Sequence, residues 1–171
     1  MSNHPYVDLA RKSIEYYLKT GKPLKSPSEL SDDFKIKAGV FVSLKKKGLL
    51  RGCIGTFMPT RDNIFEEIVI NAISASQEDP RFPKVNPDEL SEIDISVDVL
   101  SEPMMVNDIS ELDPKKFGVI VSKGYKRGLL LPDIEGVNTV QEQLRITKMK
   151  AGINPDDNDI ELYKFTVKRY K

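Results

Sequence analysis

Residues 49–56 read Leu-Leu-Arg-Gly-Cys-Ile-Gly-Thr, and this stretch decides the fold class. A short apolar run bounded by turn residues predicts a β-strand. Successive side chains of a strand point to opposite faces of its sheet, so Arg51 and Cys53 share one face, while Gly52 and Ile54 share the other. A guanidinium and the chain's single thiol are therefore predicted to lie on the same side of a sheet.

This strand belongs to a predicted β-hairpin. Residues 38–44 also alternate, and the polar stretch 45–48 that follows them contains three lysines and a glycine. Such a connection indicates a hairpin with a loop of three to five residues. A second hairpin is expected farther along the chain, from strands at 117–121 and 127–131.

Helical and strand patterns interleave over the rest of the chain. Hairpins separate the strands more often than helices do, and parallel neighbours would need long crossovers. We therefore predict an α+β fold, with a mixed, mainly antiparallel sheet and helices packed on it. The other expected elements are helices at 5–19, 61–77 (with Thr60 as N-cap) and 140–151, a strand at 93–99 with Asp94 and Asp98 on a solvated face, and a strand at 163–167.

Composition limits the class of protein. A chain of 171 residues makes one domain, or one domain with two lobes. Lys and Arg number 26, and so do Asp and Glu, so no overall field attracts nucleic acid or an acidic membrane. One cysteine excludes an internal disulfide, and neither a signal peptide nor a membrane-spanning run is evident, so we expect a cytoplasmic protein.

Metal and cofactor sites are not predicted. The single histidine, His4, lies at the N-terminus, and one histidine with one cysteine cannot make a closed zinc site. There is also no glycine-rich loop of the type that cradles phosphates. The sequence therefore predicts no metal and no cofactor.

Cys53 supports two interpretations. A cation beside a thiol favours the thiolate, which is the reactive form, and Arg51 is the candidate cation. Alternatively, a single cysteine on a strand behaves as a small buried hydrophobe. The residue pattern alone leaves both interpretations open.

A proline-bracketed segment follows the second predicted helix. Pro80 and Pro83 flank Arg81-Phe82, and each proline restricts the residue before it to extended geometry. The resulting stiff strap would suit a side chain that must be aimed, and Arg81 is the candidate. The alternative is that Arg81 pairs with Glu78 or Asp79 and only fixes the strap.

Four blocks of the sequence resemble signature motifs of one family. They are residues 49–56, Glu-Asp-Pro-Arg-Phe-Pro-Lys-Val at 78–85, Arg-Gly-Leu-Leu-Leu-Pro at 127–132 and Lys-Ala-Gly at 150–152. Together they resemble the AMMECR domain family, also called AmmeMemoRadiSam system protein A. The resemblance spans nearly all of residues 1–171 as one domain, and it implies an α+β fold in two lobes with a cleft between them.

The resemblance also directs the choice of site residues. Many family members carry a cysteine two residues before Lys-Ala-Gly, where this chain has Lys148, so a two-thiol mechanism is excluded here. We predict Cys53 and Arg51 as the catalytic pair. The predicted substrate-binding residues are Gly52, Gly55, Thr56, Asp79, Arg81, Arg127 and Lys150.

Each predicted residue has a stated chemistry. Arg81 and Arg127 would hold an anionic group through paired hydrogen bonds. Main-chain N–H groups near Gly52 and Gly55 would stabilise an oxyanion. The alternative role for Lys150 is structural, because a cation in the last turn of a helix favours the helix dipole.

Two functional hypotheses lead, ahead of a regulatory or scaffolding protein without a ligand. In the first, the chain is an accessory enzyme or a substrate-binding component of a modification pathway. The resemblance implies that its partners there would be a Memo-type protein and a radical S-adenosylmethionine enzyme. In the second, it is a non-catalytic module that binds a nucleotide, an RNA element or a partner protein, with the cysteine serving as packing.

Overall fold

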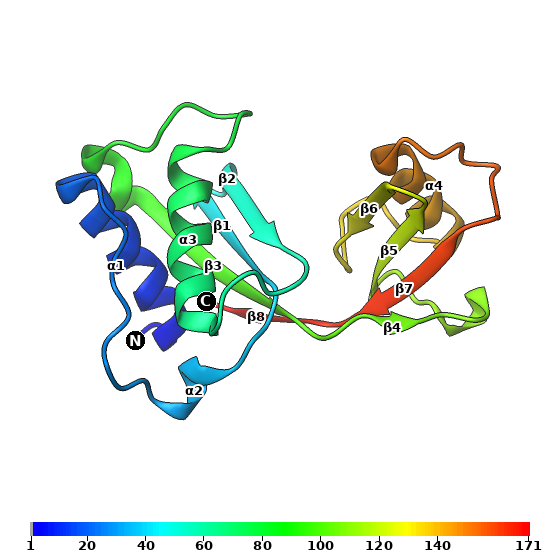
Figure 1. The fold of residues 1–171 in the computed structure, drawn as a ribbon. Helices are drawn as coiled ribbons and strands as arrows, with labels where there is room; N and C mark the ends of the chain where they lie inside the picture. Colours follow the sequence, from blue (N-terminus) through cyan, green and yellow to red (C-terminus); the bar gives the residue numbers. More distant parts are fainter. Residues whose placement is uncertain (1) are drawn as a thin grey trace. The chain divides into compact units, whose positions relative to one another are not determined.

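A computed structural model describes residues 2–171 and divides them into two compact units (Figure 1). The first unit comprises residues up to Leu100 together with Lys168–Lys171, and the second comprises Ser101–Val167. Each unit contains a four-stranded sheet, and the strand pairs described below are antiparallel. The α+β fold class is therefore confirmed, with two sheets in place of the single sheet that we expected.

The first unit packs helices against one face of its sheet (Figure 1). Alternation along the central strand buries Val40, Val42 and Leu44 in the core under α1 and α3. Its strand order is β2-β1-β3-β8. Its elements are α1 (Pro5–Thr20), α2 (Asp32–Lys35), β1 (Val40–Lys46), β2 (Leu49–Thr56), α3 (Ile64–Gln77), the 3-10 helix η1 (Pro87–Glu92), β3 (Ile93–Leu100) and β8 (Val167–Tyr170).

The β1–β2 hairpin has a two-residue turn, so the predicted loop of three to five residues was wrong. Lys47 and Gly48 both have positive φ angles, 51° and 78°, as a type I′ turn requires. Lys46 pairs with Leu49 in the strand register, and its ammonium lies 3.1 Å from the Glu92 carboxylate. Two of the lysines that looked like turn residues are thus strand residues.

Helix α3 begins later than the pattern indicated. Its N-cap is Asn63, whose side chain accepts a hydrogen bond from the Glu66 N–H, and the helix starts at Ile64. Thr60, the predicted N-cap, instead donates from its hydroxyl to the buried carboxylate of Glu67. A tertiary contact therefore replaces the cap that the sequence suggested.

The second unit has its own core and its own helix-covered sheet. Val119, Val121 and Leu162 are among the residues buried there under α4. The strand order is β4-β7-β5-β6. Its elements are β4 (Met104–Met105), the 3-10 helix η2 (Ile109–Glu111), β5 (Gly118–Lys123), β6 (Lys126–Leu130), α4 (Val140–Ala151) and β7 (Glu161–Phe165).

The single strand predicted at 163–167 was wrong, because it is divided between the units. β7 ends at Phe165 in the second sheet, and β8 begins at Val167 and joins the first sheet. Phe165 is fully buried, whereas Thr166 is exposed. The alternation was real, but it does not reveal that the chain changes sheets within it.

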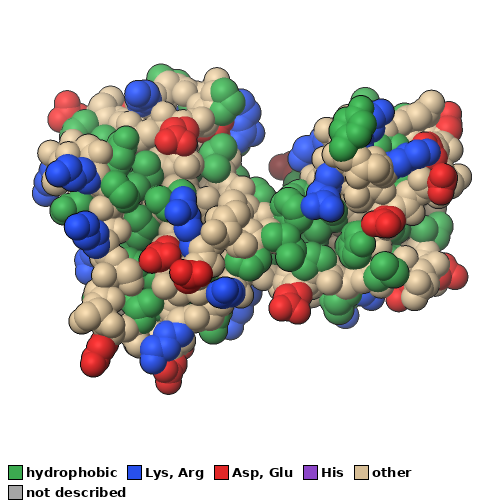
Figure 2. Space-filling view, in the orientation of Figure 1, with side chains coloured by type: hydrophobic (Ala, Val, Ile, Leu, Met, Phe, Trp, Pro, Cys, Tyr) green, Lys and Arg blue, Asp and Glu red, His purple; other side chains and the backbone are tan. Residues whose placement is uncertain are grey.

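No helix within residues 2–171 has the length and apolar character needed to cross a membrane. Acidic and basic side chains are interspersed on the face shown in Figure 2.

Candidate functional site

The strap after α3 binds the main chain of Cys53. Asp79 Oδ2 accepts a hydrogen bond from the Cys53 N–H at 3.0 Å, and Arg81 Nη2 donates to the Cys53 carbonyl at 3.1 Å. β2 lies at the edge of its sheet, so these bonds occupy the positions that a further strand would take. The strap therefore protects this edge at the residue of greatest chemical interest.

Asp79 and Arg81 also bind each other. Arg81 therefore has the role that we gave as the alternative, in which it pairs with an acidic residue and fixes the strap. The guanidinium donates to both carboxylate oxygens, from Nε at 3.0 Å and from Nη2 at 2.8 Å. The hydrogen bonds from Arg81, above all, and the N–H of Cys53 hold the pKa of the Asp79 carboxyl well below its usual range. Asp79 is thus a buried, ionised anchor at neutral pH.

Arg51 is committed to the other end of the strap. Its Nε and Nη2 donate to the two carboxylate oxygens of Glu89 at 2.8 and 3.1 Å, and its Nη1 donates to the Pro83 carbonyl at 2.7 Å. Both side chains are largely buried, at 13% and 10% exposed. The hydrogen bonds from Arg51 are the main cause of the lowered pKa of Glu89. This geometry gives Arg51 a structural role, because its guanidinium is committed to Glu89 and to the strap.

The glycines of the motif mark close contacts. A Cβ added at Gly52 would lie 2.2 Å from the Ala75 carbonyl oxygen, so α3 crosses β2 directly over this residue. A Cβ at Gly55 would lie 2.3 Å from the Phe41 ring. Both glycines are required for packing, whether or not their N–H groups meet a ligand.

Thr56 belongs to a buried polar network. Its hydroxyl donates to the Glu67 carboxylate and accepts from Asn71 Nδ2 at 3.2 Å. The same carboxylate accepts the N–H groups of Thr60 and Arg61, both at 2.9 Å. Glu67 is only 1% exposed, so these bonds compensate a buried carboxylate and fix the loop between β2 and α3.

The Cys53 thiol lies on the face of the sheet opposite the helices. It is half-buried, and its Sγ lies 3.2 Å from the Ser43 hydroxyl on β1. Ser43 is in turn directly opposite Ser96 on β3. Cys53, Ser43 and Ser96 therefore form a row of three small polar side chains across the open face of the first sheet.

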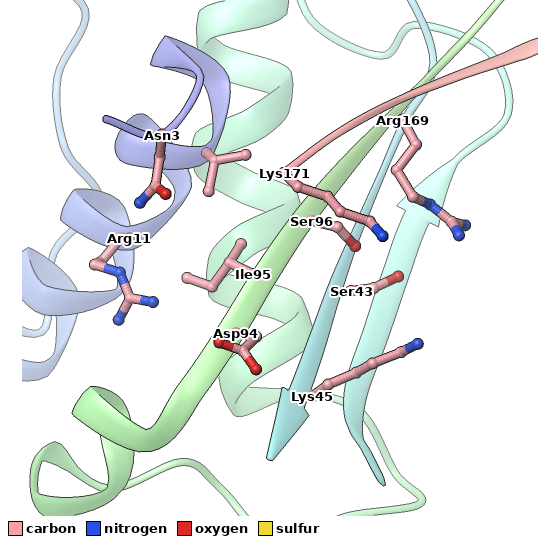
Figure 3. A pocket seen from close by; sticks show the side chains of 10 residues that line it. Asn3, Arg11, Ser43, Lys45, Asp94, Ile95, Ser96, Arg169 and Lys171 are labelled. Carbon is pink, nitrogen blue, oxygen red and sulfur yellow. The ribbon is translucent and has the colours of Figure 1, made fainter. Parts of the chain in front are cut away.

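A cavity of about 440 Å³ lies beside this row (Figure 3). Ser43 and Ser96 line it, whereas Cys53 does not and only contacts the lining residue Ser43. In Figure 3, the labelled side chains of the lining come from α1, β1, β3 and β8 and from the residues at both chain ends of the unit. The full lining comprises Asn3, Val7, Arg11, Ser43, Lys45, Asp94, Ile95, Ser96, Arg169 and Lys171, all of which belong to the first unit.

Basic side chains dominate the charged lining. Arg11, Lys45, Arg169 and Lys171 carry four positive charges, against one negative charge on Asp94. Arg11 donates to the main-chain carbonyls of Leu90 and Ile93. These acceptors are neutral, so they do not balance the positive charge of the guanidinium. The cavity is therefore an electropositive pocket with hydroxyl groups at its base.

Asp98 was predicted to lie on a solvated face of its strand, and this prediction was wrong. It is fully buried and accepts two hydrogen bonds from the Arg169 guanidinium on β8, from Nε at 2.7 Å and Nη2 at 2.8 Å. This ion pair positions Arg169 at the cavity. Asp94 is exposed, as predicted.

Sequence reasoning missed Lys45, Ser96, Arg169 and Lys171, because none of them lies in a recognisable motif. Ser43 could have been found, because the hairpin register places it opposite Cys53. Arg169 reaches the site only because β8 joins the first sheet.

The remaining predicted residues, Arg127 and Lys150, lie in the second unit. Arg127 is exposed on β6, opposite Ser122. Lys150 Nζ donates to the Leu129 carbonyl on the same strand at 3.1 Å. The structure therefore places seven of the nine predicted residues in the first unit and these two on or beside β6.

Within residues 2–171, no group of three or more His, Cys, Asp or Glu side chains is arranged to hold a metal ion. His4 caps α1, where its Nδ1 accepts from the Tyr6 N–H at 3.2 Å, and its ring packs on Tyr170 at 4.1 Å between centroids. His4 is therefore a structural residue.

These features define a two-unit α+β protein with an electropositive pocket next to a half-buried cysteine. The AMMECR1 family model matches residues 7–170, and the chain belongs to that family. A protein of Thermotoga maritima is 58% identical over 173 residues, which cover 100% of this chain and 99% of the relative.

Two further relatives help to define the fold and the context. The crystal structure of an uncharacterized protein of Pyrococcus horikoshii is 36% identical and matches with a TM-score of 0.87, covering 96% of this chain and 88% of that one. A Clostridium acetobutylicum protein is 55% identical over 169 residues, which cover 98% of this chain but only 36% of the relative. In that protein the domain is part of a much longer polypeptide.

Proposed function

We propose that the first unit binds a small anionic ligand in the pocket beside Ser43, and that the protein acts as a substrate-binding component of a modification pathway. The observation that carries this proposal is the charge of the lining, with four basic side chains against one acidic side chain. A concave site lined by one sign of charge concentrates ligands of the opposite sign.

The lining offers donors of two kinds. The hydroxyls of Ser43 and Ser96 suit phosphate or carboxylate oxygens at short range. Lys45 and Lys171 provide mobile charges at the exposed rim. Counting the Asp98 carboxylate that Arg169 binds, the site retains a net charge of two, from four positive and two negative groups. This balance favours an anion over a cation or a neutral ligand.

The size of the pocket supports a small molecule. Its volume of about 440 Å³ falls within the range of roughly 300–1,000 Å³ that small-molecule sites occupy. A mononucleotide or a phosphorylated or carboxylated metabolite would fit this volume. The pocket is a discrete hollow, whereas single-stranded nucleic acid is usually bound along a continuous basic groove.

The direct test is titration of the protein with adenosine monophosphate and with inorganic phosphate, followed by calorimetry. Lys45→Met should weaken binding about tenfold, because it removes one charge from the rim. Lys35→Met is the matched control, because Lys35 is an exposed lysine of the same unit outside the pocket. Saturable binding that is equal in both variants, or no saturable binding by the unmodified protein, would refute the proposal.

A catalytic role for Cys53 is the second candidate function. It is favoured by the 3.2 Å contact between the thiol and a hydroxyl that lines the pocket. If the ligand sits beside this thiol, saturating ligand should slow the alkylation of Cys53 by iodoacetamide. An alkylation rate that ignores bound ligand would leave the cysteine outside the site.

Partnership with a Memo-type protein and a radical S-adenosylmethionine enzyme is part of the same proposal. It is supported by the family resemblance and by the relative in which this domain makes up only 36% of the polypeptide. Analytical ultracentrifugation of the chain with such proteins from one genome would test it. Sedimentation as separate species, with and without ligand, would argue against a stable complex.

A further inference from the structure

The second unit contains a buried lysine that the proposed function does not use. Lys148 lies in α4 and is only 5% exposed. Its ammonium donates to the Pro155 carbonyl at 3.2 Å and to Asn158 Oδ1 at 3.3 Å, both neutral acceptors. Among residues 2–171, no carboxylate forms an ion pair with it within 4.0 Å.

Burying the Lys148 ammonium without a carboxylate partner costs folding free energy. A buried charge is normally paired, because the protein interior solvates an ion far less well than water does. The Asp157 carboxylate is bound to Lys123 instead, and that hydrogen bond is the main cause of its lowered pKa, with a smaller contribution from Lys148. An ammonium has three N–H donors, so Lys148 also keeps one donor beyond its two neutral partners.

A cavity of about 360 Å³ adjoins Lys148. Five of its nine lining residues are apolar, among them Leu144 from α4 and Ile160 and Leu162 from the chain near β7, while Asn158 adds an amide. Asp108 is the acidic residue of the lining, and its carboxylate accepts the Ser110 N–H within η2 at 2.9 Å. The cavity thus combines an apolar side with one cation, Lys148, and one carboxylate, Asp108, which is hydrogen-bonded within η2.

We infer that this cavity is a second ligand site, specific for a small carboxylate with an apolar tail. The carboxylate would accept the third N–H of Lys148 and neutralise its charge, and the tail would pack on Leu144 and Ile160. A phosphate with a polar body would match the ammonium but not the wall. This inference is independent of the anion pocket in the first unit.

The test uses hexanoate as the probe, with hexylamine and hexanol as charge-reversed and neutral analogues. Binding is followed by NMR chemical-shift changes in the intact protein. Hexanoate should saturate the cavity with a dissociation constant of about 1 mM, as its few heavy atoms allow. Neither analogue should bind measurably, and the shifts should map to α4 and the chain near β7.

Two variants separate a ligand site from a structural lysine. Lys148→Met should weaken hexanoate binding at least tenfold and leave the fold intact, because methionine keeps the shape of the side chain. Leu144→Phe should abolish binding by filling the cavity while the charge remains. The control Lys115→Met removes an exposed charge of the same unit outside this cavity, and it should bind as the unmodified protein does.

The inference fails if hexanoate does not saturate, if hexanol binds equally well, or if Lys148→Met retains the affinity. Should Lys148→Met unfold, Leu144→Phe still decides the matter, because undiminished binding by that variant would place hexanoate elsewhere.

Discussion

The two units of the molecule share the connectivity of three strands but differ in their chemistry. In each unit a hairpin is followed by a helix and by a third strand on the other side of the hairpin's first strand, giving β2-β1-β3 and β6-β5-β7. The fourth strand differs, because β8 follows β3 in the chain whereas β4 precedes its hairpin. Each also has an Arg-Gly pair in the second strand, with the helix packed against the glycine. The repetition is invisible as sequence identity and becomes clear only from topology.

The equivalence extends to single hydrogen bonds. The residue after Arg51-Gly52 is Cys53, whose carbonyl accepts from Arg81, and the residue after Arg127-Gly128 is Leu129, whose carbonyl accepts from Lys150. In both units a basic side chain near the end of the helix protects an edge strand at the same place. Two of the family's signature blocks therefore have a structural explanation.

The difference lies in the side chain presented at that place. Cys53 contacts Ser43 beside a basic pocket, whereas its counterpart in the second unit is an aliphatic leucine. The residues that the two units share therefore maintain the packing and the edge of each sheet, whereas the candidate chemistry lies in residues that they do not share.

The largest expected effect concerns the two helix-facing glycines. Gly52→Ala should cost about 3 kcal/mol, because its Cβ would meet the backbone oxygen of Ala75 at 2.2 Å. Gly128→Ala should cost about 1–2 kcal/mol, because its nearest contact, Thr147 O, would be at 2.8 Å. Urea unfolding measures both, and equal losses would break the ranking of the two interfaces.

A smaller effect separates the two arginines. Arg51→Gln should destabilise the protein by about 2 kcal/mol, because the largely buried Glu89 carboxylate loses its two guanidinium hydrogen bonds and keeps only Lys46, at 3.7 Å, as a cationic partner. Arg127→Gln should cost less than about 1 kcal/mol, because that side chain is exposed. The alkylation rate of Cys53 should be unchanged in Arg51→Gln, and a slower rate would restore Arg51 as an activator of the thiol.

The smallest effect is a difference in the pH dependence of stability between the protected edge strands, β2 and β6. The pKa of Asp79 is lowered on folding, so its contribution to stability is complete above the unfolded value of about 3.9 and is lost as pH falls through the lower folded value. Asp79→Asn should reduce this acid sensitivity, whereas Lys150→Met should leave it unchanged, because its contact with Leu129 involves no carboxylate. Unfolding curves from pH 7 to acid would check it, and an unchanged slope in Asp79→Asn would refute it.

The sequence predicted the framework better than the site. Period-two alternation located β2 because one face of that strand meets α3, and alternation in 93–99 located β3 for the same reason. The motif around Cys53 was recognised as a candidate, but the partners of its arginines depend on how the strap folds back onto β2. No local pattern could reveal that contact.

The pocket itself depends on long-range placement. Lys45 resembles a turn lysine in the sequence, and Arg169 lies near the end of the chain in a segment that resembles a single strand. They meet only because β8 joins the sheet beside β3. Charges brought together by sheet order leave no spacing signal, so they could not be predicted from the sequence.

The change of sheet between β7 and β8 makes the second unit an insertion within the first. The chain leaves the first unit after Leu100 and returns at Lys168, and the Ser101 N–H donates to the Thr166 carbonyl at 2.9 Å. The two ends of the inserted segment are therefore close enough to be joined by a tight turn. Excising residues 101–167 and closing the gap would give a single-sheet miniature, and the existing junction is a natural point at which a genome could exchange one inserted module for another.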